Sequence, residues 1–210
     1  MHPAVERFVP AIEVPFPLED LLRRYGPRRP AMQPLYERML GEAERLVEAK
    51  GLRRAFPSKC LPQFAARLPG AETISLGLVT LGPQLEVRVS ALFAADPAAA
   101  VVLDEIGTAW VGAIARQMHR AIREEARAQG RRAGPSYRPG IGRWPIEWQR
   151  ELFRHLPAER IGVRLTASLT MVPQKSASMI VGVGAWLGRT AMEAGQAQQG
   201  DPSKQRGMES

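Results

Sequence analysis

The sequence Tyr137-Arg-Pro-Gly-Ile-Gly-Arg-Trp-Pro-Ile-Glu-Trp-Gln149 joins a proline- and glycine-rich turn directly to the start of a predicted helix. Glycines let the backbone approach a ligand closely, and their amide groups can face a carboxylate. Arg138 or Arg143 can hold that carboxylate in a bidentate fork, and the helix start at Pro145 adds a positive dipole end. A plain surface turn before a helix has the same composition, so the residues alone allow both interpretations.

A second unusual run, Leu165-Thr-Ala-Ser-Leu-Thr-Met-Val-Pro-Gln-Lys-Ser-Ala-Ser178, follows further along the chain. It is rich in small and hydroxylated residues and lies between two predicted strands. Its hydroxyl groups can cap turns or can bind a polar ligand. Neither role is excluded by the residues alone.

The chain has 210 residues, a net charge of +8 and a single cysteine, Cys60. These totals suit one ordinary domain with appendages, and they exclude an internal disulfide framework or a cysteine-rich metal site. The start of the chain lacks the basic and apolar regions of a secretory signal, and no uninterrupted apolar run reaches about 18 residues. We therefore expect a cytoplasmic protein without a membrane-spanning helix.

Positive charge gathers between Arg116 and Arg143, a stretch that contains eight arginines and two glutamates. Such a stretch attracts nucleic acid, an acidic protein or an anionic cofactor, and it is equally typical of a solvated helix face. No aromatic residues alternate with these arginines as they do on surfaces that stack bases. We therefore do not expect nucleic acid binding.

The periodicity of the apolar residues predicts an α+β fold, with a small antiparallel sheet and surrounding helices. The expected helices cover residues 17–25, 33–50, 97–129 and 145–156, and a short one carries Leu85, Val89 and Phe93 in line. The expected strands cover residues 73–81, 160–165 and 179–186, and residues 51–72 are predicted as a proline-containing loop. Asp96 and Pro97 are a good N-cap and first residue for the long helix.

We expect three parts along the chain. Residues 1–67 form an extended and helical segment packed on the main domain, residues 68–188 form that domain, and residues 189–210 form a disordered tail. The histidines have no metal-ligand spacing, and the chain has no nucleophile elbow, P-loop or dinucleotide fingerprint. We therefore expect neither catalytic residues nor a metal site.

Several short motifs occur in a fixed order between residues 68 and 185. In chain order they are Gly70-Ala-Glu-Thr-Ile-Ser75, Val79-Thr-Leu-Gly82, Leu103-Asp-Glu-Ile-Gly-Thr-Ala-Trp110, Pro139-Gly140, Trp144-Pro145, Gln149, Ile161-Gly-Val163, Leu165-Thr166, Ser168, Met171, Pro173, Lys175-Ser176 and Ser178. In this order they resemble the activation domain of cobalamin-dependent methionine synthase, in particular small stand-alone proteins similar to that domain. A series of short matches is more specific than any one of them.

The resemblance implies a C-shaped α+β fold that binds S-adenosylmethionine in a shallow groove. It also implies a role as a stand-alone reactivation partner for a methionine synthase or related corrinoid methyltransferase, whose inactive cob(II)alamin is reductively methylated. The electron would come from a flavodoxin-like donor, and cobalamin would be carried by the partner chain. The basic part of the predicted long helix, from Arg116 to Arg132, offers a docking surface for either the flavodoxin-like donor or the corrinoid protein. Whether the chain is an enzyme by itself stays open.

Carried onto this sequence, the resemblance implies a set of cofactor-binding residues, with Arg138 holding the methionine carboxylate. The set is Arg138, Pro139, Gly140, Ile141, Gly142, Thr166, Ser168 and Ser176. Three positions depart from the family: Ser136 replaces an arginine, Ile141 a tyrosine and Ala167 a glutamate. These departures favour a second hypothesis, a degenerate binding module that docks a corrinoid protein without binding S-adenosylmethionine.

Overall fold

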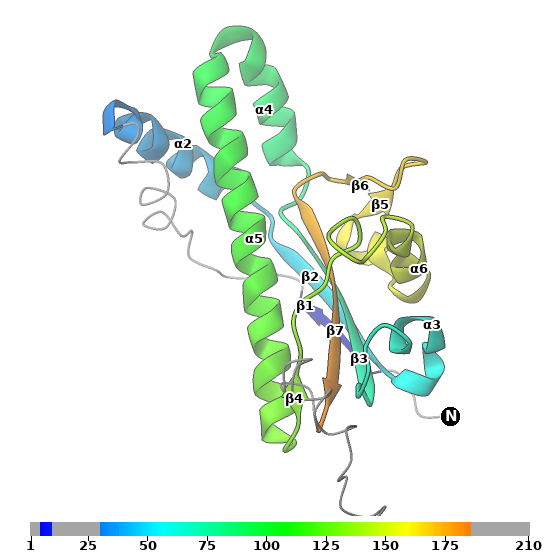
Figure 1. The fold of residues 1–210 in the computed structure, drawn as a ribbon. Coiled ribbons are helices and arrows are strands. Elements are labelled where there is room, and N and C mark those ends of the chain that lie inside the picture. The colour runs from blue at the N-terminus through cyan, green and yellow to red at the C-terminus, as the bar shows by residue number, and fades with distance from the viewer. Residues whose placement is uncertain (1–4, 10–29, 186–210) are drawn as a thin grey trace, which may run out of the picture.

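The computed structural model describes residues 5–9 and 30–185, which form a small antiparallel sheet with helices on both faces (Figure 1). The sheet has the order β1-β2-β3-β7-β4, and its strands are β1 (Val5–Val9), β2 (Lys50–Pro57), β3 (Thr73–Thr80), β7 (Ser176–Gly184) and β4 (Arg132–Ala133). A separate two-stranded sheet pairs β5 (Arg164–Leu165) with β6 (Met171–Val172). The predicted α+β fold is confirmed.

The helices divide between the two faces of the sheet (Figure 1). One face is covered by α5 (Pro97–Ala128), with α4 (Gln84–Ala95) and α2 (Gln33–Leu46) packed against it. The other face carries α3 (Pro62–Ala65), α6 (Trp148–His155) and the short helix η4 (Ala158–Ile161). Two further short helices, η2 (Pro30–Met32) and η3 (Ser58–Cys60), precede α2 and α3. Each face therefore has its own hydrophobic core, one against α5 and one against α6.

The long helix α5 begins as the sequence predicts. The Asp96 carboxylate accepts a hydrogen bond from the backbone amide of Ala99 at 3.1 Å, which satisfies one of the free amides of the first turn. The predicted apolar stripe is buried against the sheet, α2 and α4, and it comprises Leu103, Ile106, Trp110, Ile114 and Met118. The cap and the stripe together fix where the helix starts and which side faces the core.

By length and composition alone, α5 is apolar enough to cross a membrane. However, 56% of its apolar window is buried inside the fold, and the helix packs on α2, α4, β3, β4 and β7. The apolar composition of α5 is therefore explained by its burial in the core. This composition is weak evidence for a membrane-spanning helix.

The two central strands divide their side chains between the two cores. On β3, Ile74, Leu76 and Leu78 join the core beside α6, while Val79 joins the core beside α5. Gly77 lies between them, where a Cβ atom would come within 2.7 Å of the Met118 sulfur. This close contact lets α5 lie directly on the sheet. The whole of β7 is buried, so the sheet centre is fixed on both faces.

The prediction of a loop over residues 51–72 is wrong, because this stretch contains most of β2 and all of α3. Two consecutive arginines, Arg53 and Arg54, interrupt the apolar pattern of β2. In the structure, Arg53 is buried and pairs with Glu125 of α5 at 2.6 Å, so a strand residue that looks polar in sequence faces the protein interior.

Several predicted boundaries also move. Helix α2 ends at Leu46, and α6 is shorter than the predicted helix over residues 145–156. The predicted strand over residues 160–165 is mostly η4 and a turn, which leaves only the two residues of β5. Phe93 of α4 is exposed, and its neighbour Leu92 fills the core instead.

Some expectations concern residues outside the described ranges. The helix over residues 17–25 and the tail over residues 189–210 lie there. Strands β1 and β2, from the first 67 residues, pair in the same sheet as β3 and β7. The division into three parts stays a prediction.

Candidate functional site

The two unusual segments of the sequence meet at one cavity of about 430 Å³, which opens between the turn before α6, the β5–β6 loop and the start of β7. Its lining residues are Arg138, Pro139, Ile141, Ile146, Gln149, Ser168, Leu169, Thr170, Met171, Gln174, Ser176, Ala177 and Ser178. Segments about 30 residues apart in the chain are thus brought together by the pairing of β7 with the sheet.

The turn before α6 is closed by backbone hydrogen bonds. The amide of Gly140 donates to the carbonyl of Trp144 at 2.7 Å, and the amide of Ile141 donates to the carbonyl of Arg138 at 3.2 Å. Gly140 has a φ of 85°, in the left-handed region that favours glycine. Two hydrogen bonds between Tyr137 and Ile180 of β7 fasten the turn to the sheet.

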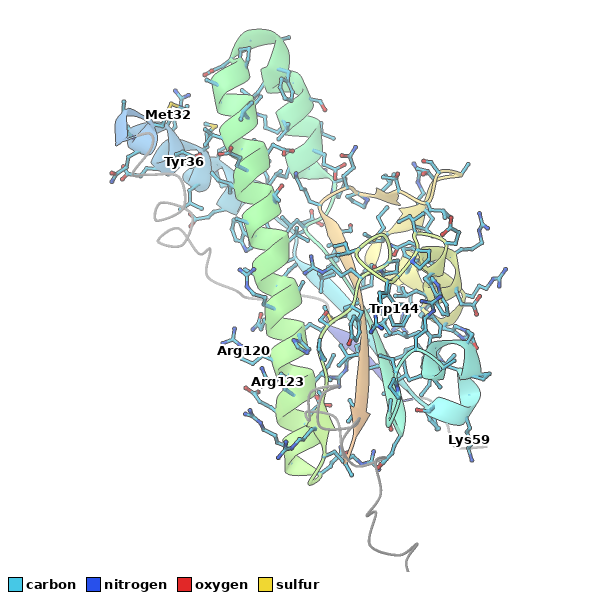
Figure 2. All side chains as sticks on the ribbon, viewed as in Figure 1. Met32, Tyr36, Lys59, Arg120, Arg123 and Trp144 are labelled. Carbon is cyan, nitrogen blue, oxygen red and sulfur yellow. The ribbon has the colours of Figure 1, made fainter. Side chains whose placement is uncertain are left out.

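The tryptophans of this segment are structural. Trp144 is buried, and its ring lies 5.3 Å from that of Trp148 and 6.3 Å from that of Phe64 (Figure 2). The guanidinium group of Arg67 lies over the Trp148 ring at 5.0 Å. This cluster anchors the start of α6 in the core, and none of these rings lines the cavity.

Helix α6 is held in place by polar contacts of Glu151. Gln63 and Arg154 each donate a hydrogen bond to its carboxylate at 2.7 Å, and His155 lies 3.3 Å from it. Burial raises the pKa of Glu151, but the hydrogen bonds from Gln63, His155 and Arg154 outweigh burial and lower the pKa below its usual value. The fold therefore stabilises Glu151 as a carboxylate.

Arg138 is the one charged residue among the described residues that line the cavity. Its side chain is half-buried, and it forms no ion pair or side-chain hydrogen bond with any residue the structure describes. A partly desolvated cation without a counter-charge favours the binding of an anion. Of the two arginines considered for this role, Arg138 lines the cavity, whereas Arg143 is exposed and is not among its lining residues.

The hydroxyl groups of the β5–β6 loop mostly satisfy one another. The Thr166 hydroxyl accepts a hydrogen bond from the amide of Thr170 at 3.1 Å and lies 2.9 Å from the Ser168 hydroxyl. Leu169, at the tip, has a φ of 63°, which is uncommon for a residue with a side chain. These bonds hold Leu169 in a strained conformation against the cavity.

Gln149 of α6 and Ser178 of β7 are two polar residues of the cavity lining. Both are buried, and the Ser178 hydroxyl donates to the Gln149 side-chain oxygen at 2.9 Å. The Gln149 Nε2 group makes no hydrogen bond to another described residue. It is therefore left to donate to a ligand in the cavity.

Lys175 and Ser176 fasten the start of β7, to helix α5 and to strand β3 respectively. The Lys175 ammonium pairs with Asp104 at 2.7 Å and donates to Thr108 of α5 at 2.9 Å. The Ser176 hydroxyl donates its proton to the carbonyl of Pro173 at 2.7 Å and lies 2.9 Å from the Thr80 hydroxyl, from which it can accept. Although Ser176 lines the cavity, its hydroxyl proton is already used.

No protein-family model matches the chain, and no curated protein was found as a relative. Among solved structures, the crystal structure of the MetH reactivation domain bound to AdoHcy is similar, with a TM-score of 0.62. The match covers 86% of this chain and 78% of that chain, at 17% sequence identity. The fold is that of the MetH reactivation domain. At this level of identity, the likeness concerns the fold alone.

Within this reactivation-domain fold, five of the eight predicted cofactor-binding residues line the cavity, namely Arg138, Pro139, Ile141, Ser168 and Ser176. Gly140, Gly142 and Thr166 belong to the same two segments but are not among its lining residues. Whether any of the eight binds a cofactor stays a prediction.

The cavity also has lining residues that the sequence analysis did not assign to it. Ile146 falls within the helix predicted over residues 145–156, but it precedes α6 and is exposed at the cavity rim with Ile141. Leu169 and Gln174 carried no signal in the sequence beyond their place in the hydroxyl-rich run. In the described ranges, no group of three or more His, Cys, Asp or Glu side chains is placed to hold a metal ion.

Proposed function

We propose that the chain binds S-adenosylmethionine in this cavity and acts as a stand-alone reactivation partner for a corrinoid methyltransferase. The observation that carries the proposal is the unpaired Arg138 in a cavity built from both family-like segments. The likeness of the fold to a reactivation domain that was crystallised with AdoHcy supports the same ligand class. The ligand supplies the methyl group, and cobalamin belongs to the partner chain.

Each part of the cavity suits one part of such a ligand. Arg138 holds the amino acid carboxylate, because a guanidinium fork matches a carboxylate in geometry and charge. Gln149 donates from its Nε2 group, and Ile141 and Ile146 at the rim provide apolar contacts for the adenosine. The chain thus positions the methyl donor, and positioning is its main contribution to the reaction.

Calorimetric titration with S-adenosylmethionine tests the binding step. Arg138→Gln should weaken binding about ten- to a hundredfold, because a charge-assisted hydrogen-bonding pair contributes about 1.5–3 kcal/mol. Arg138→Lys should lose less, because it keeps the charge without the bidentate geometry. Arg143→Gln is the matched control in the same turn and should leave the affinity unchanged. Absence of heat from the unmodified chain would disprove the proposal.

Under a second hypothesis, the chain has the same fold and docks the same corrinoid partner but does not bind S-adenosylmethionine. It is favoured by the β5–β6 loop, where Thr166, Ser168 and Thr170 bond one another instead of offering free hydroxyls. Under this hypothesis the chain docks a corrinoid protein as a binding module. Co-purification with a cobalamin protein, together with no affinity for S-adenosylmethionine, is the result it expects.

We further infer that the partner or its electron donor docks on an arginine stripe of α5, defined as Arg116, Arg120, Arg123 and Arg127. These residues recur at helical spacing over about 16 Å and are exposed. None of them forms an ion pair with a residue the structure describes. Figure 2 places Arg120 and Arg123 on the side of α5 away from the strands. An acidic surface, such as that of a flavodoxin-like donor, complements this stripe.

A further inference from the structure

The cavity has positive charge and no negative charge. Arg138 contributes the positive charge, and no carboxylate appears among the described residues that line it. Two acidic side chains near the start of β7 are engaged elsewhere: Glu86 accepts from the amide of Lys175 at 2.7 Å, and Asp104 pairs with the Lys175 ammonium. A second positive charge placed in the cavity would therefore lack a counter-ion.

The described lining of the cavity also lacks an aromatic ring, the second kind of protein group that stabilises a cation. A positive ligand centre is commonly held against the face of an aromatic ring. No aromatic side chain is among the described lining residues, because Trp144 and Trp148 pack into the core beside Phe64. Apart from Arg138, the lining groups that a positively charged ligand atom could contact are neutral. They are hydroxyl groups, the amides of Gln149 and Gln174, and apolar side chains such as Met171.

We propose that this cavity selects its ligand by charge and binds S-adenosylhomocysteine, a neutral thioether, more tightly than S-adenosylmethionine, a sulfonium cation. This inference rests on the proposed function, because it assumes that this ligand class enters the cavity. The two ligands differ by one methyl group and one positive charge. Repulsion between the sulfonium charge and an incompletely neutralised arginine in the same cavity predicts a difference of roughly three- to tenfold in affinity.

The preference has a consequence for methyl donation. The donor loses its positive charge when the S–CH3 bonding electrons stay on sulfur and the methyl carbon bonds to the electron pair of a reduced corrinoid. A cavity that binds S-adenosylhomocysteine more tightly than S-adenosylmethionine therefore favours methyl transfer from the bound donor to the corrinoid. The same preference makes the product a competitive inhibitor of the next round.

Parallel calorimetric titrations of the full chain with the two ligands test the preference directly. The expected result is a dissociation constant about three- to tenfold lower for S-adenosylhomocysteine. Gln174→Glu adds a negative charge to the cavity at an exposed, lining position and nearly preserves the shape of the side chain. It should improve binding of the sulfonium ligand relative to the thioether and so reduce the ratio.

Gln117→Glu, on the exposed surface of α5, is the matched control and should leave the ratio as it is. If both ligands bind and S-adenosylmethionine binds equally or more tightly, the charge selection is overturned while the proposed function stands. A ratio that Gln174→Glu does not change overturns the electrostatic cause. If neither ligand binds, the proposed function itself fails, and the inference fails with it.

Discussion

Arg138 differs from the two buried cationic side chains in the described part of the chain, Arg53 and Lys175, because each of those forms an ion pair within the protein. Arg53 pairs with Glu125 at 2.6 Å, and Lys175 pairs with Asp104 at 2.7 Å, and both cationic side chains are about nine-tenths buried. Arg138 is half-buried at a cavity and has no partner among the described residues. Desolvating a cation costs free energy, so the unpaired Arg138 at a cavity supports the proposal of an anionic ligand group there.

The lowered pKa of Glu151 predicts how the free energy of unfolding depends on pH. Its pKa is lowered in the folded chain, so its contribution is fully present above the unfolded pKa and is lost as pH falls through the folded pKa. Glu151→Gln should therefore lower the melting temperature at about pH 7 and lose this effect towards about pH 3. Thermal unfolding followed by circular dichroism across that range measures the difference.

Glu147→Gln serves as the control for this experiment. Glu147 is exposed at the start of α6, and its carboxylate makes no hydrogen bond or ion pair within residues 30–185. This variant should follow the pH dependence of the unmodified chain. If Glu151→Gln lowers the melting temperature equally at both ends of the pH range, the ionised carboxylate of Glu151 is not the cause of the stabilisation.

At the scale of elements, the sequence predicted those whose signals are local. The Asp96 cap and the stripe from Leu103 to Met118 specify α5, and the apolar run at Thr73 specifies β3. Strand β2 could not be recognised in the same way. Its polar residue Arg53 is neutralised by Glu125, 72 positions further along the chain, and this contact exists only after folding.

The candidate site shows the same limit. The residue types of both segments pointed to turns and to a ligand, and both segments do border one cavity. The sequence could not reveal that Ile146 lies before α6 at the cavity rim, or that Leu169 adopts a positive φ. These features follow from how β7 and α6 fix the ends of the two loops, which depends on long-range packing.

The turn before α6 depends on one glycine. Gly140→Ala forces a side chain into a left-handed conformation and places its Cβ 3.1 Å from Ile146. We expect a loss of about 1–2 kcal/mol in the free energy of unfolding, with weaker ligand binding because Arg138 and Ile141 shift. Urea denaturation and calorimetry measure the two effects.

A second glycine gives the opposite expectation. Gly41 lies within α2, where nothing approaches within 4 Å of an added Cβ. Gly41→Ala should stabilise the chain by up to about 1 kcal/mol, because alanine favours the helix. Equal effects of the two substitutions on stability would show that the backbone conformation of Gly140 does not matter.

For the whole molecule, the sheet separates two surfaces with different chemistry. Helix α6 and the β5–β6 loop lie on one face of the sheet and α5 lies on the other (Figure 1). The first two border the cavity, and α5 carries the arginine stripe. A partner docked on the stripe therefore leaves the cavity open to a ligand and to the corrinoid. This arrangement is the one that the proposed function requires, because the chain would then contact a donor and an acceptor together.

The arginine stripe predicts salt-dependent docking. Arg120→Glu with Arg123→Glu should slow association with an acidic flavodoxin-like protein about tenfold or more at low salt, because exposed charges act mainly on the association rate. The effect should shrink as salt approaches about 0.5 M, where screening becomes strong. Arg45→Glu with Lys59→Glu makes the same change in net charge on other exposed surfaces, and Lys59 lies near α3 (Figure 2). If both double variants slow association equally, net charge and not the stripe attracts the partner.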